Sequence, residues 1–138
     1  MGRIADRLHS AAIHLLRRLR VQDESLGVSA PRLSVLSVLV FGGPKRIGEL
    51  ARVEQVEPPT ISRLVDALAR DGLAVREPDP RDARAVVVRA TPEGRRILER
   101  GRSRRLESLE ASLRGLSERE LRTLRGGVDI LERILREG

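Results

Sequence analysis

The chain has 138 residues, about the size of one domain, and its 27 Lys and Arg outnumber its 20 Asp and Glu for a net charge of +7. It contains no cysteine, which excludes disulfides, thiol redox sensing, thiolate zinc sites and cysteine nucleophiles. Its only aromatic residue is Phe41, so we do not expect a single-strand binder that stacks bases on aromatic side chains.

The distribution of charge bears on where the protein works and what it binds. The longest stretch without a charged residue, 33–44, has twelve residues and is too short to span a bilayer. Residues 1–7 form no apolar signal segment, so we expect a cytoplasmic protein without membrane contact. Every basic residue except Lys45 is Arg, which favours bidentate contacts with phosphate and guanine. A GC-rich codon bias would explain the same excess of Arg.

The N-terminal third of the chain is expected to form two helices. Apolar residues recur at helical spacing over 4–19, and the segment 23–27 ends this helix. Ser29 can cap a second helix that has Pro31 in its first turn, and the Gly-Gly-Pro run at 42–44 stops it.

The middle of the chain predicts a helix-turn-helix. A short helix over 47–52 is followed by a turn, and the next helix runs from about Pro58 to Asp71 with Gly72 as its left-handed cap. Val56 precedes this helix in the first position of a hydrophobic staple. The inward face of the helix repeats at i, i+3, i+4 and i+7 and consists of Ile61, Leu64, Val65 and Leu68.

The pattern then changes to the period of a β-hairpin. Residues alternate over 73–77, turn residues gather over 79–83, and β-branched residues over 85–88 indicate a second strand. A hairpin directly after a helix-turn-helix predicts a winged helix whose wing has a charged tip.

Two long helices are expected after the hairpin. Thr91 caps the first, with Pro92 at its first position, and this helix reaches about Arg114. Ser117 begins the capping box of the last helix, which ends near Arg136. Apolar residues repeat at the 3-4 spacing of a coiled-coil seam, at positions 106, 109, 113 and 116 and at 121, 124, 128, 131 and 135. A chain of this size cannot cover such seams alone, so we expect a homodimer.

The outward face of the helix that begins at Pro58 carries candidate DNA contacts. Hydroxyl side chains and an Arg near a helix N-terminus suit contacts with base edges and phosphates. An ordinary solvated helix face would have a similar composition. The residues on or near this face are Pro59, Thr60, Ser62, Arg63, Ala67 and Arg70.

The wing tip at 79–84 provides a second set of candidates. Its two arginines, Arg81 and Arg84, can enter a narrow minor groove, where the negative potential is enhanced. Asp82 is close enough to Arg84 for an ion pair that aims the guanidinium. For an isolated hairpin, a solvated turn whose charges only provide solubility is the alternative.

Several stretches between 47 and 94 match one known pattern. The wing reads DPRDAR at 79–84, and ATPEG follows at 90–94. They are preceded by IGELA at 47–51 and PPTISRLV at 58–65. These segments resemble the MarR family of bacterial transcriptional regulators, whose wing has the signature D-x-R-D-x-R. The family's following segment is L-T-P-E-G, where this chain has Ala90 in place of Leu.

The resemblance implies a homodimer, joined by its terminal helices, that binds a palindromic operator in double-stranded DNA. It also implies release by small anionic or phenolic ligands, as is frequent in the family. By the family pattern, Arg84 enters the minor groove and Asp82 orients it. Thr60, Ser62 and Arg63 match the contact positions of the recognition helix.

Two features depart from the simplest DNA-binding pattern. Glu57 stands where the family usually has Ser or a similar cap, and its carboxylate suits the helix dipole but repels phosphate if it faces DNA. Residues 44–91 carry nine basic and eight acidic side chains, a net charge of +1. The placement of charges, rather than their sum, must therefore attract DNA.

A few polar and small residues remain. His9 and His14 are five residues apart, so they do not share a helix face as two metal ligands would, and we expect packing or solvent exposure. MarR-like proteins often bind effectors where the terminal helices meet the winged helix, which makes His14, Arg17 and Arg18 candidates for such a pocket. Gly126-Gly127 allows two interpretations, a close helix approach at a dimer seam or a kink or local break.

The sequence thus predicts one domain over 1–138, mainly α with a small β-hairpin. It comprises a winged helix-turn-helix over about 29–91 with its wing over about 73–90, and dimerisation helices over 1–20 and 92–138. We expect a sequence-specific DNA-binding transcriptional regulator, a homodimeric repressor that a small-molecule effector can release. A non-enzymatic protein-interaction module is the alternative. No Ser/His/Asp arrangement, Gly-rich phosphate loop or paired carboxylates stands out, so we expect neither an enzyme nor a cofactor or metal.

Overall fold

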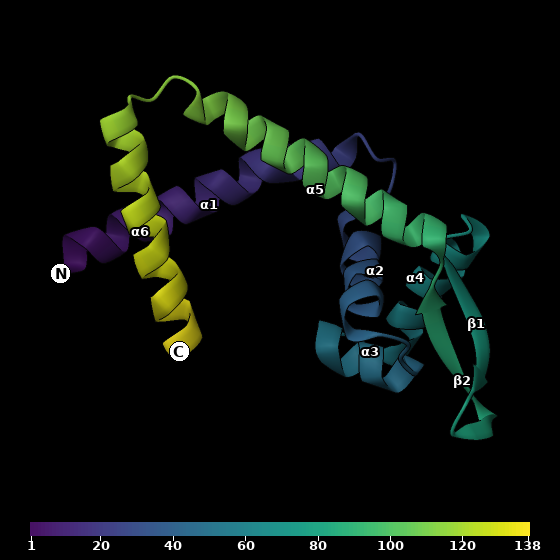
Figure 1. Cartoon of the computed structure of the whole chain (residues 1–138). Coiled ribbons are helices and arrows are strands. Elements are labelled where there is room, and N and C mark those ends of the chain that lie inside the picture. The colour runs from purple at the N-terminus through teal and green to yellow at the C-terminus, as the bar shows by residue number, and fades with distance from the viewer. The chain divides into compact units, whose positions relative to one another are not determined.

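Six helices and one hairpin make up the chain, and the computed structural model describes all of residues 1–138 (Figure 1). The helices are α1 (Gly2–Glu24), α2 (Ala30–Gly42), α3 (Ile47–Glu54), α4 (Pro58–Arg70), α5 (Pro92–Leu113) and α6 (Glu118–Glu137), and the strands are β1 (Ala74–Asp79) and β2 (Asp82–Ala90). This order confirms the predicted, mainly α fold with a hairpin between the fourth and fifth helices. The chain divides into two compact units, Met1–Arg105 and Leu106–Gly138, with the division inside α5.

An aliphatic core in the first unit holds α2, α3, α4 and the hairpin together. Helix α4 packs against α2 and α3 and contacts β1, while α2 contacts β2. Burying each aliphatic side chain of this size stabilises the fold by about 1.5–3 kcal/mol. Packing therefore fixes how α4 and the wing are held. The largest fully buried side chains are Leu36, Leu39, Leu50, Ile61, Leu68, Val35, Val65 and Val88.

The wing is an antiparallel pair whose second strand is longer than predicted. Strand β2 begins at Asp82, which pairs with Asp79, so only Pro80 and Arg81 form the tip. The predicted turn over 79–83 was therefore too long. The physical reason lies in Asp79, whose Oδ1 accepts the Arg81 amide at 2.9 Å and closes the turn within two residues.

A third piece of backbone extends this small sheet. The Lys45 amide donates to the Val88 carbonyl at 3.0 Å, and the Val88 amide donates to the Lys45 carbonyl at 2.8 Å. The segment between α2 and α3 thus lies alongside β2. A two-stranded hairpin is marginal by itself in water, and this pairing ties the base of the wing to the helices.

The start of α5 is tied to the start of the wing. Thr91 Oγ1 accepts the Gly94 amide at 3.1 Å, which confirms the predicted cap, and the same hydroxyl donates to the Gly72 carbonyl at 2.6 Å. Gly94 is buried, and a Cβ there would meet the Leu73 carbonyl oxygen and come within 2.9 Å of Leu36 Cδ1. Only glycine allows this close approach.

Some predicted helix ends were wrong. Helix α1 spans Gly2–Glu24 rather than 4–19, because helical geometry continues through the polar segment after the apolar stripe. Ser29 precedes α2, but its side chain does not cap the helix; its Oγ instead accepts a hydrogen bond from Arg32 Nε at 3.1 Å.

In the second unit, α6 begins with the predicted capping box. The Glu120 amide donates to Ser117 Oγ at 3.1 Å, and the Ser117 amide donates to Glu120 Oε2 at 2.8 Å. The helix continues without interruption through Gly126 and Gly127, which excludes a local break there. The interpretation of these glycines as a close approach at a dimer seam stays a prediction.

Helices α1 and α6 each leave most of their apolar residues exposed. Neither helix contains a buried residue. In α1 the exposed fraction is 44% for Leu8 and 54% for Leu16, and in α6 it is 43% for both Leu124 and Val128. None of the helices combines the length and the hydropathy that a membrane-spanning helix requires.

Candidate nucleic-acid interface

The turn between α3 and α4 sets the direction of α4. Gln55 ends α3 in the left-handed conformation with φ of 58°, the only non-glycine residue with positive φ. Leu50 and Ala51 of α3 and Ile61 and Val65 of α4 are buried, so the two helices share one core. The opposite face of α4 is consequently directed to solvent.

The predicted contact residues of α4 lie on or beside that solvent face. Pro59 and Arg63 are exposed, and Thr60 and Ser62 are half-buried. The Arg63 guanidinium forms no ion pair or hydrogen bond within the chain. It is therefore available for an external acceptor.

At the wing tip, the predicted ion pair between Asp82 and Arg84 is present. Asp82 Oδ1 lies 3.2 Å from Arg84 Nε and also accepts the Arg84 amide at 3.1 Å. The Arg84 side chain is nevertheless 92% exposed, so its terminal amino groups face solvent. Arg81, also exposed, makes only its backbone hydrogen bond to Asp79.

The base of the tip contains a residue pair that sequence reasoning missed. Asp79 is 8% exposed, and its Oδ2 accepts Arg46 Nε at 2.9 Å and lies 2.7 Å from Arg46 Nη2. The Arg81 amide and the Arg46 guanidinium hold the pKa of the Asp79 carboxyl below its ordinary value. The hydrogen bond and charge of Asp79 raise the pKa of Arg46 in turn. Asp79 could be singled out from the sequence, because it is the first Asp of the wing motif. Nothing in the sequence indicated its partner Arg46, which lies 33 residues earlier.

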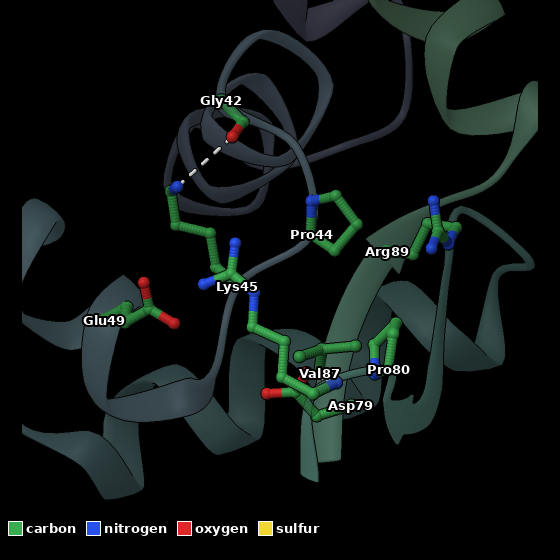
Figure 2. A pocket seen from close by; sticks show the side chains of 9 residues that line it. Gly42, Pro44, Lys45, Glu49, Asp79, Pro80, Val87 and Arg89 are labelled. Atoms are coloured by element: carbon green, nitrogen blue, oxygen red, sulfur yellow. Dashed lines mark hydrogen bonds between the residues drawn. The ribbon is translucent and has the colours of Figure 1, made fainter. Parts of the chain in front are cut away.

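A hollow of about 360 Å³ lies beside this pair (Figure 2). The segment between α2 and α3 lines one side with Lys45, whose Nζ donates to the Gly42 carbonyl at 3.2 Å. The wing lines the other side with Asp79, Pro80 and Val87 (Figure 2).

A second ion pair joins the wing to α4. Arg76 Nη1 of β1 lies 2.5 Å from Asp66 Oδ1 of α4. Across the hairpin, Arg89 Nε lies 2.5 Å from Glu77 Oε1. Several acidic residues of this segment are thus paired with arginines, and the segment still presents guanidinium groups to solvent at the tip and on α4 although its net charge is near zero.

Glu57 precedes α4 as its N-cap residue. Its side chain is exposed and does not hydrogen-bond to the helix end. The carboxylate is therefore in solvent at the same end of α4 as Thr60, where it would repel a phosphate that approached this end.

A separate cavity of about 450 Å³ lies among α1, α2 and the first part of α5. It is lined on its polar side by Arg20, Asp23 and Arg105, with Asp23 and Arg105 paired at 2.5 Å. None of the sequence candidates His14, Arg17 and Arg18 lines it, because their helix positions precede the end of α1 that borders the cavity. His9 and His14 are exposed, and no group of three or more His, Asp or Glu side chains is arranged to hold a metal ion.

The chain is similar to several known regulators. Residues 26–85 match the model of the MarR family. An uncharacterized HTH-type transcriptional regulator of Mycobacterium bovis is 35% identical over 130 residues, which cover 94% of this chain and 91% of the relative. The HTH-type transcriptional repressor IacR of Pseudomonas putida is 27% identical over 91% of this chain and 73% of its own length. The transcriptional regulator Tm0710 of Thermotoga maritima is 25% identical in sequence, and its crystal structure superposes with a TM-score of 0.88. The match covers 99% of this chain and 96% of that one.

Proposed function

Because the chain belongs to the MarR family of DNA-binding transcriptional regulators, we propose that it is a homodimeric repressor of a palindromic operator. In this proposal α4 reads base edges in the major groove, and the wing enters the adjacent minor groove. Residues 1–20 and 92–138 supply the dimer interface. The protein is proposed to act through binding alone, without catalysis.

The observation that carries the proposal is the state of two arginines. Arg63 on α4 is exposed and unpaired, and Arg84 at the wing tip is held by Asp82 with its terminal amino groups in solvent. Both belong to the first unit, in which the Lys45–Val88 pairing joins the wing to the helices. Two such arginines on one body fit a base contact in one groove and a shape-dependent contact in the next.

Further observations support the proposal that the protein represses transcription and recognises a palindrome. The Pseudomonas putida relative is named a transcriptional repressor. A two-fold dimer presents two copies of α4, and such a dimer binds half-sites related by the same symmetry. The uncovered apolar faces of α1 and α6 are suited to form that dimer.

Release by a small ligand is assigned to the cavity among α1, α2 and α5. Its apolar wall includes Leu26 and Leu33, and Arg20 and Arg105 provide positive charge, a lining that fits a small aromatic or aliphatic carboxylate. Benzoate is a suitable probe. It should weaken binding to DNA by the unmodified protein and have less effect on Arg20→Met.

Selection of DNA by the purified protein tests the function. Random duplexes should be enriched for a palindrome whose half-sites are about 10 bp apart, centre to centre. Mapping of bound DNA across the genome should recover the same palindrome, and removal of the gene should raise transcription beside it. A folded dimer that enriches no duplex would overturn the proposal in favour of the protein-interaction module. Lowered transcription after removal would show an activator instead.

A further inference from the structure

We propose that Arg46 is a positioning residue for the wing: by holding Asp79, it fixes the wing tip in the place from which Arg84 reaches the minor groove. The inference rests on the proposed function and adds a residue outside both DNA-reading elements. Arg46 is the residue that precedes α3, and its role is carried out entirely through Asp79.

Asp79 connects Arg46 to the turn of the wing through its two oxygens. Oδ2 accepts Arg46 Nε at 2.9 Å, and Arg46 Nη2 lies 2.7 Å from the same oxygen. Oδ1 accepts the Arg81 amide at 2.9 Å. One buried carboxylate thus bonds to the start of α3 and to the backbone of the tip at the same time.

From this point the connection to the DNA-reading arginine is short. Asp79 pairs with Asp82 across the end of the hairpin, and Asp82 bonds to both the amide and the Nε of Arg84. The backbone pairing of Lys45 with Val88 holds β2 only farther down the strand. A two-residue tip of a marginal hairpin needs an attachment beyond that point. The pair of Arg46 and Asp79 supplies it.

The side chain of Arg46 is free for this role because of how α3 begins. Its backbone amide donates to Glu49 Oε1 at 3.1 Å, so the helix start is closed by Glu49. A guanidinium has no acceptor atom for the first amides of a helix, which is why Ser, Thr, Asp and Asn are preferred at this position. Arg46 therefore does not improve the cap, and its fork extends instead to the wing.

An ion pair between two exposed side chains contributes little to stability. The pair of Arg46 and Asp79 differs because one of its partners is buried. The Asp79 side chain is 9% exposed, against 45% for that of Arg46. Without Arg46, Oδ2 of a buried carboxylate has no partner, and such a group is costly to leave unpaired. The tip can restore hydration of the carboxylate by moving away from α3, and this movement displaces Arg84.

The test compares Arg46→Met and Arg46→Lys with a matched control, Arg52→Met. Arg52 is an exposed arginine of α3, the helix that Arg46 precedes, and it forms no ion pair. The probe is a duplex enriched from a random pool by the unmodified protein, with its flanks then replaced by A·T pairs only or by G·C pairs only. A second duplex carries one changed base pair in the core of a half-site. Affinities for all of these duplexes are measured by fluorescence anisotropy at several salt concentrations.

We expect the unmodified protein to bind the duplex with A·T flanks more tightly than the duplex with G·C flanks. In Arg84→Ala the ratio of these two affinities should fall about tenfold. Arg46→Met should lose most of the same preference, while its discrimination against the changed core stays intact. The double variant Arg46→Met/Arg84→Ala should show the same flank preference as Arg84→Ala alone, because Arg46 acts on this preference only through Arg84. Arg46→Lys, which keeps a charged donor, should recover part of the preference, and Arg52→Met should retain all of it.

Loss of folding alone would lower affinity for every duplex equally and leave both preferences unchanged. Hydrogen exchange of the Arg81 and Arg84 amides provides a readout without DNA, and it should speed up in Arg46→Met and not in Arg52→Met. Unchanged flank preference in Arg46→Met, unchanged exchange at Arg81, or additive losses in the double variant would each overturn the inference. Failure of the unmodified protein to enrich any duplex would overturn the proposed function instead.

Discussion

A single carboxylate at the wing tip illustrates how residue placement outweighs residue charge. Asp82 bonds to two N–H groups of Arg84 and thereby restricts a long, flexible side chain that is otherwise almost fully in solvent. A restricted arginine loses less conformational entropy when it enters a groove. In the proposed complex the negative charge of Asp82 opposes DNA, whereas its effect on the aim of Arg84 favours binding.

The first prediction decides between these two effects. Asp82→Ala should weaken binding to the selected duplex, because the aim of Arg84 is lost, and the loss should be largest when the flanks are A·T-rich. Arg81→Ala is the matched control: it should weaken binding to all flanks equally and reduce the salt slope by about one unit, as a phosphate contact does. Titrations at several salt concentrations measure both variants. Tighter binding by Asp82→Ala at every salt concentration would show that Asp82 acts only through its charge.

A second prediction concerns α4, the proposed recognition helix. Arg63→Ala should cost about 1–3 kcal/mol on the selected duplex and relax the preference at one base position, because a free, exposed arginine suits a base-edge contact. Arg70→Ala, which changes another exposed arginine at the far end of α4, is the control and should have a smaller effect. Competition with random DNA distinguishes the roles. An equal loss on random DNA would make Arg63 a phosphate contact.

A third prediction follows from the pKa of Asp79, which is lowered in the folded protein by the Arg81 amide and the Arg46 guanidinium. A carboxyl whose folded pKa lies below its unfolded value of about 3.9 stabilises the fold above that pH, and the stabilisation is lost as the pH falls through the folded pKa. Asp79→Asn keeps an acceptor for the Arg81 amide but removes the charge. Urea unfolding should therefore show the variant less stable near neutral pH, with a difference that shrinks below about pH 4. A difference independent of pH would contradict this assignment.

At the scale of elements, the sequence indicated what is decided locally. The caps at Thr91 and Ser117 are each set by residues within one helical turn, and both were predicted correctly. The ion pair of Asp82 and Arg84 is two residues apart and was predicted for the same reason. Arg46 and Asp79 were missed because their contact depends on the fold, which brings the start of α3 to the wing.

Other errors at this scale have a similar origin. Strand β2 was predicted too short because its tip is closed by a side-chain contact of Asp79 that strand propensity does not include. Ser29 was expected to cap α2, but Arg32 competes for its hydroxyl. The effector candidates on α1 came from the family resemblance and stay a prediction; none of them lines the cavity that three helices form near Arg20.

A fourth prediction tests the junction between the wing and α5. Gly94→Ala should lower the free energy of unfolding by about 1–3 kcal/mol, because its methyl group would overlap the Leu73 carbonyl and press on Leu36. Gly48→Ala is the matched control, since a Cβ there meets nothing within 4 Å. This control should instead stabilise the protein by up to about 1 kcal/mol through helix propensity. Denaturant titrations of both variants measure the pair, and equal effects would show that the junction is loosely packed.

At the scale of the whole molecule, the main feature is apolar surface that the chain itself leaves exposed to solvent. The core of the first unit is covered, yet α1 and α6 contain no buried residue and expose leucine, isoleucine and valine side chains along their lengths. Large exposed apolar patches are unusual on monomers and typically mark interaction sites. A second copy of the chain offers the same faces, and its two-fold arrangement would also duplicate α4 and the wing for a palindromic site.

The last prediction is that the protein is a dimer in solution. Interfaces of this kind typically bury about 2,000 Å² or more and are strongly apolar, so the dimer should persist at micromolar concentration. Light scattering of the unmodified protein should give twice the chain mass of 15.3 kDa. Leu124→Glu combined with Val128→Glu places charges on the exposed apolar face of α6 and should abolish the dimer. Binding to the palindrome should be lost with it, whereas binding to a single half-site should be weakened less. Arg125→Glu makes a charge change on an exposed polar position of the same helix and should leave the dimer intact. A folded monomer at micromolar concentration would refute the homodimer and would require another partner for the faces of α1 and α6.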